Sequence, residues 1–161
     1  MKEILGRRMM KPRIFTISMM LLISIVMLTP IIVSAISSSY SYNAVYIVDG
    51  KANGIYHTLN KGTATIDGHA FYNGSKENWA DGITPPGETV TYCLYREKTG
   101  FDTSYGCVNH YVSKNNDKSN VSKIKESFPS KLDSDSSKYY LVIVKSNNGW
   151  KIVGSGKLST P

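Results

Sequence analysis

The two cysteines, Cys93 and Cys107, are the residues whose chemistry the sequence defines most directly. Both follow an N-terminal segment with the features of an export signal, and exported cysteine pairs normally form disulfides in an oxidising compartment. A redox-active pair is usually spaced as CxxC, whereas these two cysteines are much farther apart. We therefore expect a structural disulfide that closes a loop of about 15 residues and stabilises the fold by about 3 kcal/mol.

Histidines could bind a metal, but their spacing does not favour a site. His57, His69 and His110 lie far apart in the sequence, and none of them forms a close pair such as HxxxH. Zinc sites usually draw on closely spaced histidines and cysteines, and both cysteines are expected to be used in the disulfide. We expect no metal and no cofactor.

Serines and carboxylates could carry catalysis, but their sequence context is unlike that of catalytic residues. Ser155 lies in Gly154-Ser155-Gly156, which is not the GxSxG motif of a serine nucleophile, and we expect this segment to relieve crowding or form a bulge. Asp133 and Asp135 lie in a serine-rich turn without the apolar neighbours that raise a carboxyl pKa. Calcium binding at this turn is an alternative, although the turn lacks the glycine and distal glutamate of an EF-hand. We expect no catalytic residue.

Aromatic residues are the most suggestive group, because aromatic side chains stack on sugar rings and anchor protein partners. All 11 tyrosines and both tryptophans lie after residue 35. Five aromatic residues are expected on the outer face of one predicted hairpin or in the loops around it. These candidate binding residues are Trp79, Tyr95, Phe101, Tyr105 and Tyr111. The alternative is that they line the core or form cross-strand ladders.

The elements that position these residues are predicted to be short β-strands separated by turns. Glu88–Arg96 alternates most clearly, and Ser104–Val112 is its expected partner. A hairpin centred near Gly100 then places the two cysteines opposite each other, and Tyr95 opposite Tyr105. The disulfide should therefore link neighbouring strands of one hairpin.

Five further segments have strand-like patterns, which gives about seven short strands in about 120 residues. These segments are Tyr42–Val48, Ile55–Leu59, Thr63–Tyr72, Lys138–Val144 and Trp150–Leu158. Ser37–Tyr42 is predicted to be a polar lead-in, and Val121–Phe128 one or two helical turns. This pattern predicts an all-β fold, a small antiparallel β-sandwich.

The segment from Leu132 to Tyr140 resembles the turn that leads into a late strand of immunoglobulin-like domains. In that turn a buried tyrosine hydroxyl bonds the backbone just upstream. The resemblance implies an immunoglobulin-like sandwich, although neither cysteine lies where antibody domains place theirs. A small closed β-barrel is the competing fold.

Residues 1–35 have the pattern of a signal peptide. The segment from Ile14 to Ala35 is uncharged and follows a basic front of five residues, Lys2, Arg7, Arg8, Lys11 and Arg13. Such a front stays in the cytoplasm while the apolar run enters the translocation path. Val33-Ser34-Ala35 suits signal peptidase, so we place cleavage after Ala35. The apolar run, about 22 residues, could also span a bilayer, and an uncleaved membrane anchor is therefore the alternative.

We expect residues 36–161 to form one secreted, extracellular domain, or a membrane-anchored domain if the leader is not cleaved. Charge and composition restrict the classes of partner that this domain could bind. The formal charge of the whole chain is +7, but most of it belongs to the leader. The remaining basic residues are scattered among acids, so we expect no nucleic-acid partner. The leading hypothesis is a non-enzymatic domain that binds an extracellular polysaccharide or protein. The alternative is a secreted antagonist, either an antimicrobial or toxin-like protein or an inhibitor of an extracellular enzyme. A hydrolase with an unrecognised site is the third hypothesis.

Overall fold

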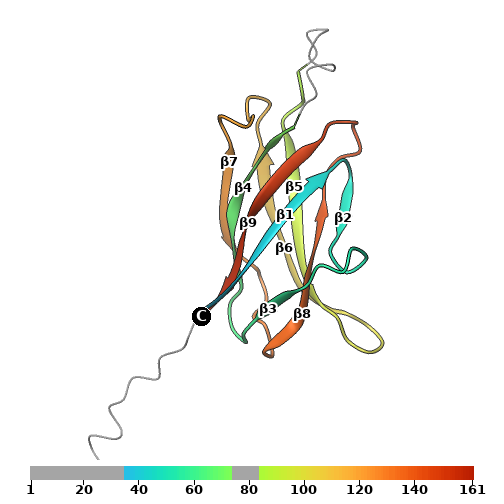
Figure 1. The fold of residues 1–161 in the computed structure, drawn as a ribbon, viewed down its shortest axis with the longest axis vertical. Helices are drawn as coiled ribbons and strands as arrows, with labels where there is room; N and C mark the ends of the chain where they lie inside the picture. The colour runs from blue at the N-terminus through green and yellow to red at the C-terminus, as the bar shows by residue number, and fades with distance from the viewer. Residues whose placement is uncertain (1–34, 74–83) are drawn as a thin grey trace, which may run out of the picture. The chain divides into compact units, whose positions relative to one another are not determined.

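The computed structural model describes residues 35–73 and 84–161, which form nine strands in two antiparallel sheets (Figure 1). The strands are β1 (Ile36–Ala44), β2 (Ile47–Asp49), β3 (His57–Leu59), β4 (Thr65–Tyr72), β5 (Glu88–Arg96), β6 (Thr103–Val112), β7 (Ser122–Ser127), β8 (Ser136–Val144) and β9 (Ile152–Thr160). The four-stranded sheet has the order β1-β9-β4-β7. The five-stranded sheet has the order β2-β8-β5-β6, and β3 pairs with β8 beyond the end of β2.

The two sheets pack face to face as a sandwich, which confirms the predicted all-β class. Alternate side chains of each strand point into one shared hydrophobic core, as the twofold periodicity of strands requires. On β5, for example, Val90, Tyr92 and Leu94 are all fully buried. Because the strands belong to two separate sheets, the competing closed barrel is wrong.

The core between the sheets contains large tyrosines, and small residues opposite make room for them. The hydroxyls of Tyr42 on β1 and Tyr92 on β5 share a hydrogen bond of 2.6 Å across the sandwich. The ring of Tyr42 lies directly over Gly154 on β9, so closely that any Cβ there would collide with it. This contact confirms that the Gly154-Ser155-Gly156 segment relieves crowding.

Three segments differ from the sequence prediction. Tyr42–Val48, predicted to be one strand, is divided between β1 and β2, which belong to different sheets. Ser37–Tyr42, predicted to be a polar lead-in, is part of β1, because Tyr40 and Tyr42 are buried against the opposite sheet. Val121–Phe128, predicted to be helical, contains strand β7. Its side chains alternate, with Ile124 in the core and the lysines on either side exposed, so the segment pairs with β4 as an edge strand.

The turn before β8 behaves as its resemblance to immunoglobulin-like domains implied. Tyr139 is fully buried, and its hydroxyl donates a hydrogen bond of 2.6 Å to the carbonyl oxygen of Ser134. Residues 35–73 and 84–161 contain no helix long and apolar enough to cross a membrane. The predicted leader, except for Ala35, lies outside the described residues.

Candidate functional site

The disulfide joins the two strands of the β5–β6 hairpin. Cys93 and Cys107 are direct register partners, and their Cα atoms are 4.0 Å apart. Both side chains lie on the outer face of the five-stranded sheet, where Cys107 is exposed. The prediction that the bond links neighbouring strands of one hairpin is confirmed.

A β-bulge just past the disulfide changes which tyrosines reach this outer face. Between the Cys93 pair and the Tyr95 pair, β6 has one residue more than β5, and Tyr95 therefore faces Ser104. Gly106 supplies the positive φ of 91° that this kind of bulge favours. The extra residue turns Tyr105 inward, where it is only 2% exposed and donates a hydrogen bond of 2.5 Å to Asp133 Oδ1. The prediction that Tyr105 lies on the outer face, opposite Tyr95, is wrong for this reason.

Three tyrosines form what we call the aromatic cluster, which consists of Tyr56, Tyr95 and Tyr140. Tyr95 on β5 and Tyr140 on β8 are register partners and stack with ring centroids 5.5 Å apart. Tyr56, which precedes β3, meets Tyr140 edge-on at 6.3 Å. Tyr140 is almost fully covered, so the accessible surface of the cluster belongs to Tyr56 and Tyr95.

Asp102, in the β5–β6 hairpin loop, connects this cluster to the neighbouring loop. Its Oδ2 accepts hydrogen bonds of 2.7 Å from the Tyr140 hydroxyl and from Lys51 Nζ, and its Oδ1 accepts one of 3.2 Å from the Lys98 N–H. The bond from Lys51, followed by that from Tyr140, lowers the pKa of Asp102 to about 2. The carboxylate therefore stays ionised and holds the β2–β3 loop against the hairpin loop.

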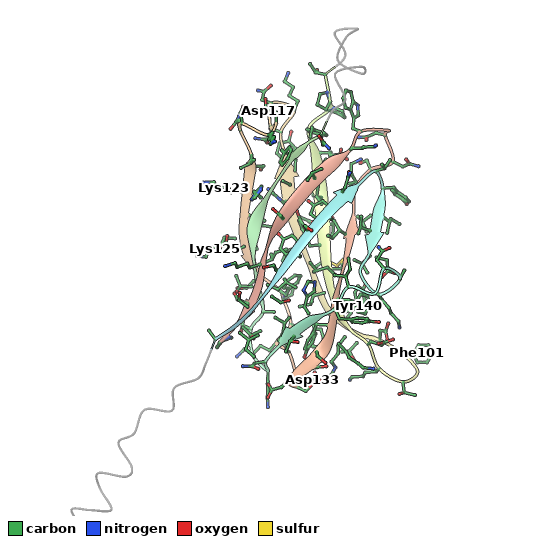
Figure 2. All side chains as sticks on the ribbon, viewed as in Figure 1. Phe101, Asp117, Lys123, Lys125, Asp133 and Tyr140 are labelled. Carbon is green, nitrogen blue, oxygen red and sulfur yellow. A yellow bond between two sulfur atoms is a disulfide. The ribbon has the colours of Figure 1, made fainter. Side chains whose placement is uncertain are left out.

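Phe101 lies at the tip of the same hairpin and is 95% exposed. Figure 2 shows its side chain at the end of the β5–β6 loop, beyond the strands. The disulfide and the bonds of Asp102 brace the hairpin that carries it. The exposed ring is therefore presented on a well-supported loop.

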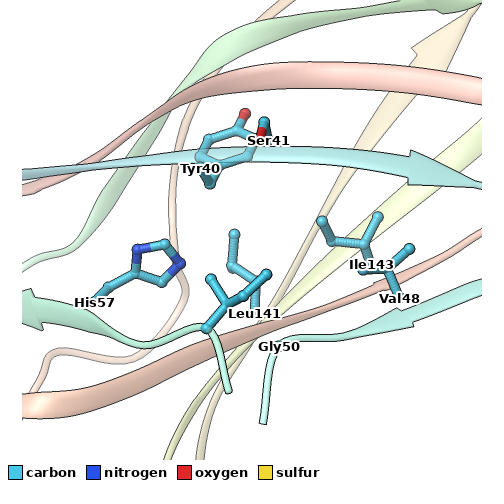
Figure 3. A pocket seen from close by; sticks show the side chains of 8 residues that line it. Tyr40, Ser41, Val48, Gly50, His57, Leu141 and Ile143 are labelled. Atoms are coloured by element: carbon cyan, nitrogen blue, oxygen red, sulfur yellow. The ribbon is translucent and has the colours of Figure 1, made fainter. Parts of the chain in front are cut away.

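Further exposed apolar residues follow the free edge of the five-stranded sheet, where β2, the β2–β3 loop and β3 lie against β8. We call them the edge patch, which consists of Val45, Tyr46, Ile47, Ile55 and Tyr56. Behind the patch, a pocket of about 20 Å³ separates β1 from this edge, with Tyr40 on one side and His57, Leu141 and Ile143 on the other (Figure 3). That volume is enough for about one water molecule, so a larger ligand would bind on the patch and not inside the pocket.

The structure does not gather the five predicted binding residues into one surface. Tyr95 and Phe101 belong to the same end of the hairpin, and Tyr105 is in the core. Tyr111 is 62% exposed and pairs with Thr89, about 20 Å along the strands from Tyr95. Trp79 lies outside the described residues.

Sequence reasoning missed Tyr56 and Tyr140 as members of the site. The alternation of Lys138–Val144 could have placed Tyr140 on the outer face, since Leu141 and Ile143 point into the core. Its partner Tyr95 could then have been found only from the order of the strands, which the sequence does not give. Tyr56 reaches the cluster from a loop, where no periodicity applies.

The histidines lie in separate places within the described residues. His57 bonds Ser38 Oγ at 2.9 Å, His69 bonds Ser155 Oγ at 3.3 Å, and His110 lies between Tyr92 and Ser122. In the part of the chain that the structure describes, no group of three or more His, Cys, Asp or Glu side chains is placed to hold a metal ion. The aromatic cluster, Phe101 and the edge patch offer exposed apolar contact area.

No protein-family model, no curated protein and no solved structure matches this chain.

Proposed function

We propose that this protein is an exported, non-enzymatic binding domain that engages an extracellular or cell-surface partner through the aromatic cluster, Phe101 and the edge patch. Export is inferred from the leader sequence, with its basic front and uncharged run ending at Ala35. The disulfide in the body agrees with an oxidising compartment. The partner is a protein or a polysaccharide.

The observation that carries the proposal is the distribution of exposed apolar side chains. Seven large hydrophobic residues are exposed among the described residues. Five of them form the edge patch, and the sixth is Phe101 on the hairpin that is bonded to the neighbouring loop. The seventh, Tyr111, lies apart. Exposed apolar groups that follow one sheet edge from end to end are typical of interaction surfaces.

The composition of the patch favours a protein over a polysaccharide. Sugar rings stack on flat aromatic faces, but Val45, Ile47 and Ile55 are aliphatic. A projecting phenylalanine such as Phe101 gains most when it fills a hollow in its partner, as anchor residues of protein interfaces do. Lys51 and Asp102 add charged groups near the hairpin tip, which would suit a polar rim.

The proposal can be tested with labelled protein and intact cells of the producing organism. The double variant Tyr56→Ala/Phe101→Ala should bind at least about tenfold more weakly, because it removes two anchor side chains. Tyr111→Ala is the control, since it removes an exposed aromatic ring elsewhere, and its binding should equal that of the unmodified protein. Absence of saturable binding, or an equal loss in the control, would contradict the proposal.

The class of partner follows from pretreating the same cells. Binding that disappears after the cells are treated with protease, and survives glycan-degrading enzymes, supports a protein partner. The reverse pattern indicates a polysaccharide. Each outcome keeps the same surface and changes only the partner.

An antagonist of an extracellular enzyme is the second candidate, and the hairpin tip is what favours it. Phe101 projects from a loop braced by a disulfide and by the Lys51–Asp102 bond, and a rigid projecting loop is suited to enter an active-site cleft. Protease-inhibition and growth-inhibition assays test this candidate. It requires inhibition by the unmodified protein that is lost in Phe101→Ala.

A further inference from the structure

The edges of the two sheets differ in how well they are protected against pairing with another strand. β7 carries Lys123, Lys125 and Glu126, and charges on an edge strand disfavour strand addition. β6 has the bulge at Gly106, which interrupts its pairing geometry. On the remaining edge of the five-stranded sheet, β2 and β3 are only three residues long each. These three edges have the protection that natural sheets usually show.

β1 has none of these features. It is nine residues long, its register with β9 runs from Ile36 to Ala44 without a shift, and it contains no proline and no charged residue. Among the described residues it pairs with β9 on one side only and forms an end of the four-stranded sheet (Figure 1). A long, flat and uncharged edge strand is a template for adding another strand.

The side chains of β1 restrict what kind of strand can be added. Tyr40, Tyr42 and Ala44 are buried in the domain's own core, so they are not available to a partner. The outward side chains are short and polar, namely those of Ser37, Ser39, Ser41 and Asn43. A matching strand therefore needs a free backbone edge and small, uncharged outward residues. β1 itself meets both requirements.

We propose that β1 pairs antiparallel with β1 of a second copy of this chain, so that the protein forms a two-fold dimer. Because β1 carries no charge, two copies face each other without like-charge repulsion, and opposed serines can form cross-strand hydrogen bonds. The pairing joins the two four-stranded sheets into one continuous sheet. Each copy offers a single unprotected edge, so association closes at two copies.

This inference goes beyond the proposed function, because the dimer uses the backbone edge of the four-stranded sheet. The aromatic cluster and Phe101 belong to the other sheet and its hairpin, whereas Ile55 of the edge patch lines the same pocket as Tyr40 and Ser41 of β1. Tyr56→Ala/Phe101→Ala leaves β1 unchanged, so a dimer that persists in this variant is expected whether or not the variant still binds its partner. The dimer is tested with substitutions on β1 and the binding surface with Tyr56→Ala/Phe101→Ala, so a failure of one proposal is distinguishable from a failure of the other.

The test is sedimentation equilibrium of the body, residues 36–161, which contains every described strand, the disulfide and the core, and belongs to one compact unit. We expect a concentration-dependent dimer. In Ser39→Lys/Ser41→Lys, four like charges meet across the strand pair, so the dissociation constant should rise at least about tenfold. Both serines are exposed, so the circular dichroism spectrum and melting temperature should stay close to those of the unmodified body.

The matched control is Thr89→Lys/Ser127→Lys, which adds the same charge at exposed positions on β5 and β7. This control should remain a dimer. A body that is monomeric up to about 1 mM overturns the proposal, and so does a dimer that survives the lysines on β1 unchanged.

A second measurement locates the interface directly. When Ser39→Cys and Ser41→Cys bodies are mixed and oxidised, an antiparallel pair centred on Tyr40 brings the two new thiols opposite each other. A mixed disulfide dimer is the expected product. Its absence under conditions where the unmodified body is dimeric contradicts the central register and with it the proposed pairing.

Discussion

The two ends of the sandwich both contain ion pairs, but they place them in opposite surroundings. At the end where β8 finishes, Lys145 has a fully buried side chain and lies 3.3 Å from Glu88, which is also buried. Its ammonium group also donates to two backbone carbonyls and to Asn148 Oδ1. At the hairpin end each pair has one solvent-exposed partner: the buried Arg96 is bonded to Asp133, a carboxylate that is 54% exposed, and the largely covered Asp102 holds the half-exposed Lys51.

This difference indicates that the buried charges stabilise the fold, whereas the charges at the hairpin end hold surface loops in place. A buried ion pair has lost its contact with water, so each partner depends on the other for stability. Exposed pairs contribute little to stability because water screens them, but they can hold loops in place. The Lys51–Asp102 pair contacts the aromatic cluster through the Tyr140 hydroxyl. The comparison therefore assigns the fully buried charges to one end, and the charges that hold the loops around the aromatic cluster and Phe101 to the other.

The largest expected effect comes from breaking the buried pair with Lys145→Met. The substitution keeps an apolar chain of similar length but leaves the Glu88 carboxylate buried, and its Oε2 has no hydrogen-bond partner among the described residues. We expect a loss of about 3–5 kcal/mol in the free energy of unfolding, measured by urea denaturation. At the other end, Arg96→Met should cost clearly less, because the Asp133 carboxylate is already 54% exposed and keeps the hydrogen bond from the Tyr105 hydroxyl.

A second substitution shows whether the cost is electrostatic. Glu88→Leu in the Lys145→Met background removes the stranded carboxylate, and most of the lost stability should return. Equal losses in Lys145→Met and Arg96→Met would break the comparison between the two ends. A failure of Glu88→Leu to restore stability would show that the lysine acts through packing instead.

The parts of the fold that the sequence predicts correctly depend on local patterns. The alternation of Glu88–Arg96 and the turn near Gly100 are enough to pair Cys93 with Cys107, and the turn before β8 identifies the bonded Tyr139. The prediction of a polar lead-in at Ser37–Tyr42 is wrong because the serines on its outward face give the segment the composition of a linker. What makes it a strand is the burial of its tyrosines against residues more than a hundred positions later.

The candidate site was less predictable for a related reason. Phe101 was identified because a residue at a hairpin tip is exposed whatever the register. The prediction for Tyr105 is wrong because the extra residue at Gly106 moves the side chains that precede it in β6 to the opposite face of the sheet. A glycine in a strand is not enough to predict a bulge. Tyr140 meets Tyr95 because β8 pairs with β5, and Tyr56 meets Tyr140 because β3 pairs with β8. Both pairings depend on the order of the strands, which local patterns do not give.

Acidification is expected to have an intermediate effect on the free energy of unfolding. This effect comes from a buried histidine and not from the charges at the hairpin end. His110 on β6 lies between the hydroxyls of Tyr92 and Ser122, and burial, followed by the charge of His69, lowers its pKa to about 4. The unfolded chain binds this proton near pH 6.5, before the folded chain does. The stability that depends on neutral His110 is therefore complete above about pH 6.5 and is lost as the pH falls towards 4.

The measurement is the free energy of unfolding at pH 7 and at pH 5. Between these values we expect a loss on the order of 1 kcal/mol, reduced by solvent that reaches the half-exposed Ser122. In His110→Gln this loss should shrink, although His57, whose pKa burial also lowers, keeps part of it. Asp102 changes the stability only below about pH 4, because the pKa of its carboxyl is about 4 in the unfolded chain but about 2 in the folded protein, so its contribution is constant between pH 7 and 5. An unchanged pH dependence in His110→Gln would mean that another group carries the effect.

The smallest effect on stability is expected at Asp102, and this variant sharpens the comparison most. Asp102→Asn removes the charge that holds Lys51, but Lys51 is half exposed and the amide oxygen of asparagine can still accept the bond from Tyr140, so the urea midpoint should stay close to that of the unmodified protein. The β2–β3 loop should nevertheless become more mobile, and limited trypsin digestion should cut faster after Lys51. Asp135→Asn is the control, since Asp135, in the turn before β8, accepts a bond from the Lys61 N–H and forms no ion pair among the described residues. If Asp102 only positions the binding surface, Asp102→Asn should be cut faster at unchanged stability. A large drop in stability would instead show that Asp102 is a structural charge at the hairpin end and would contradict the comparison.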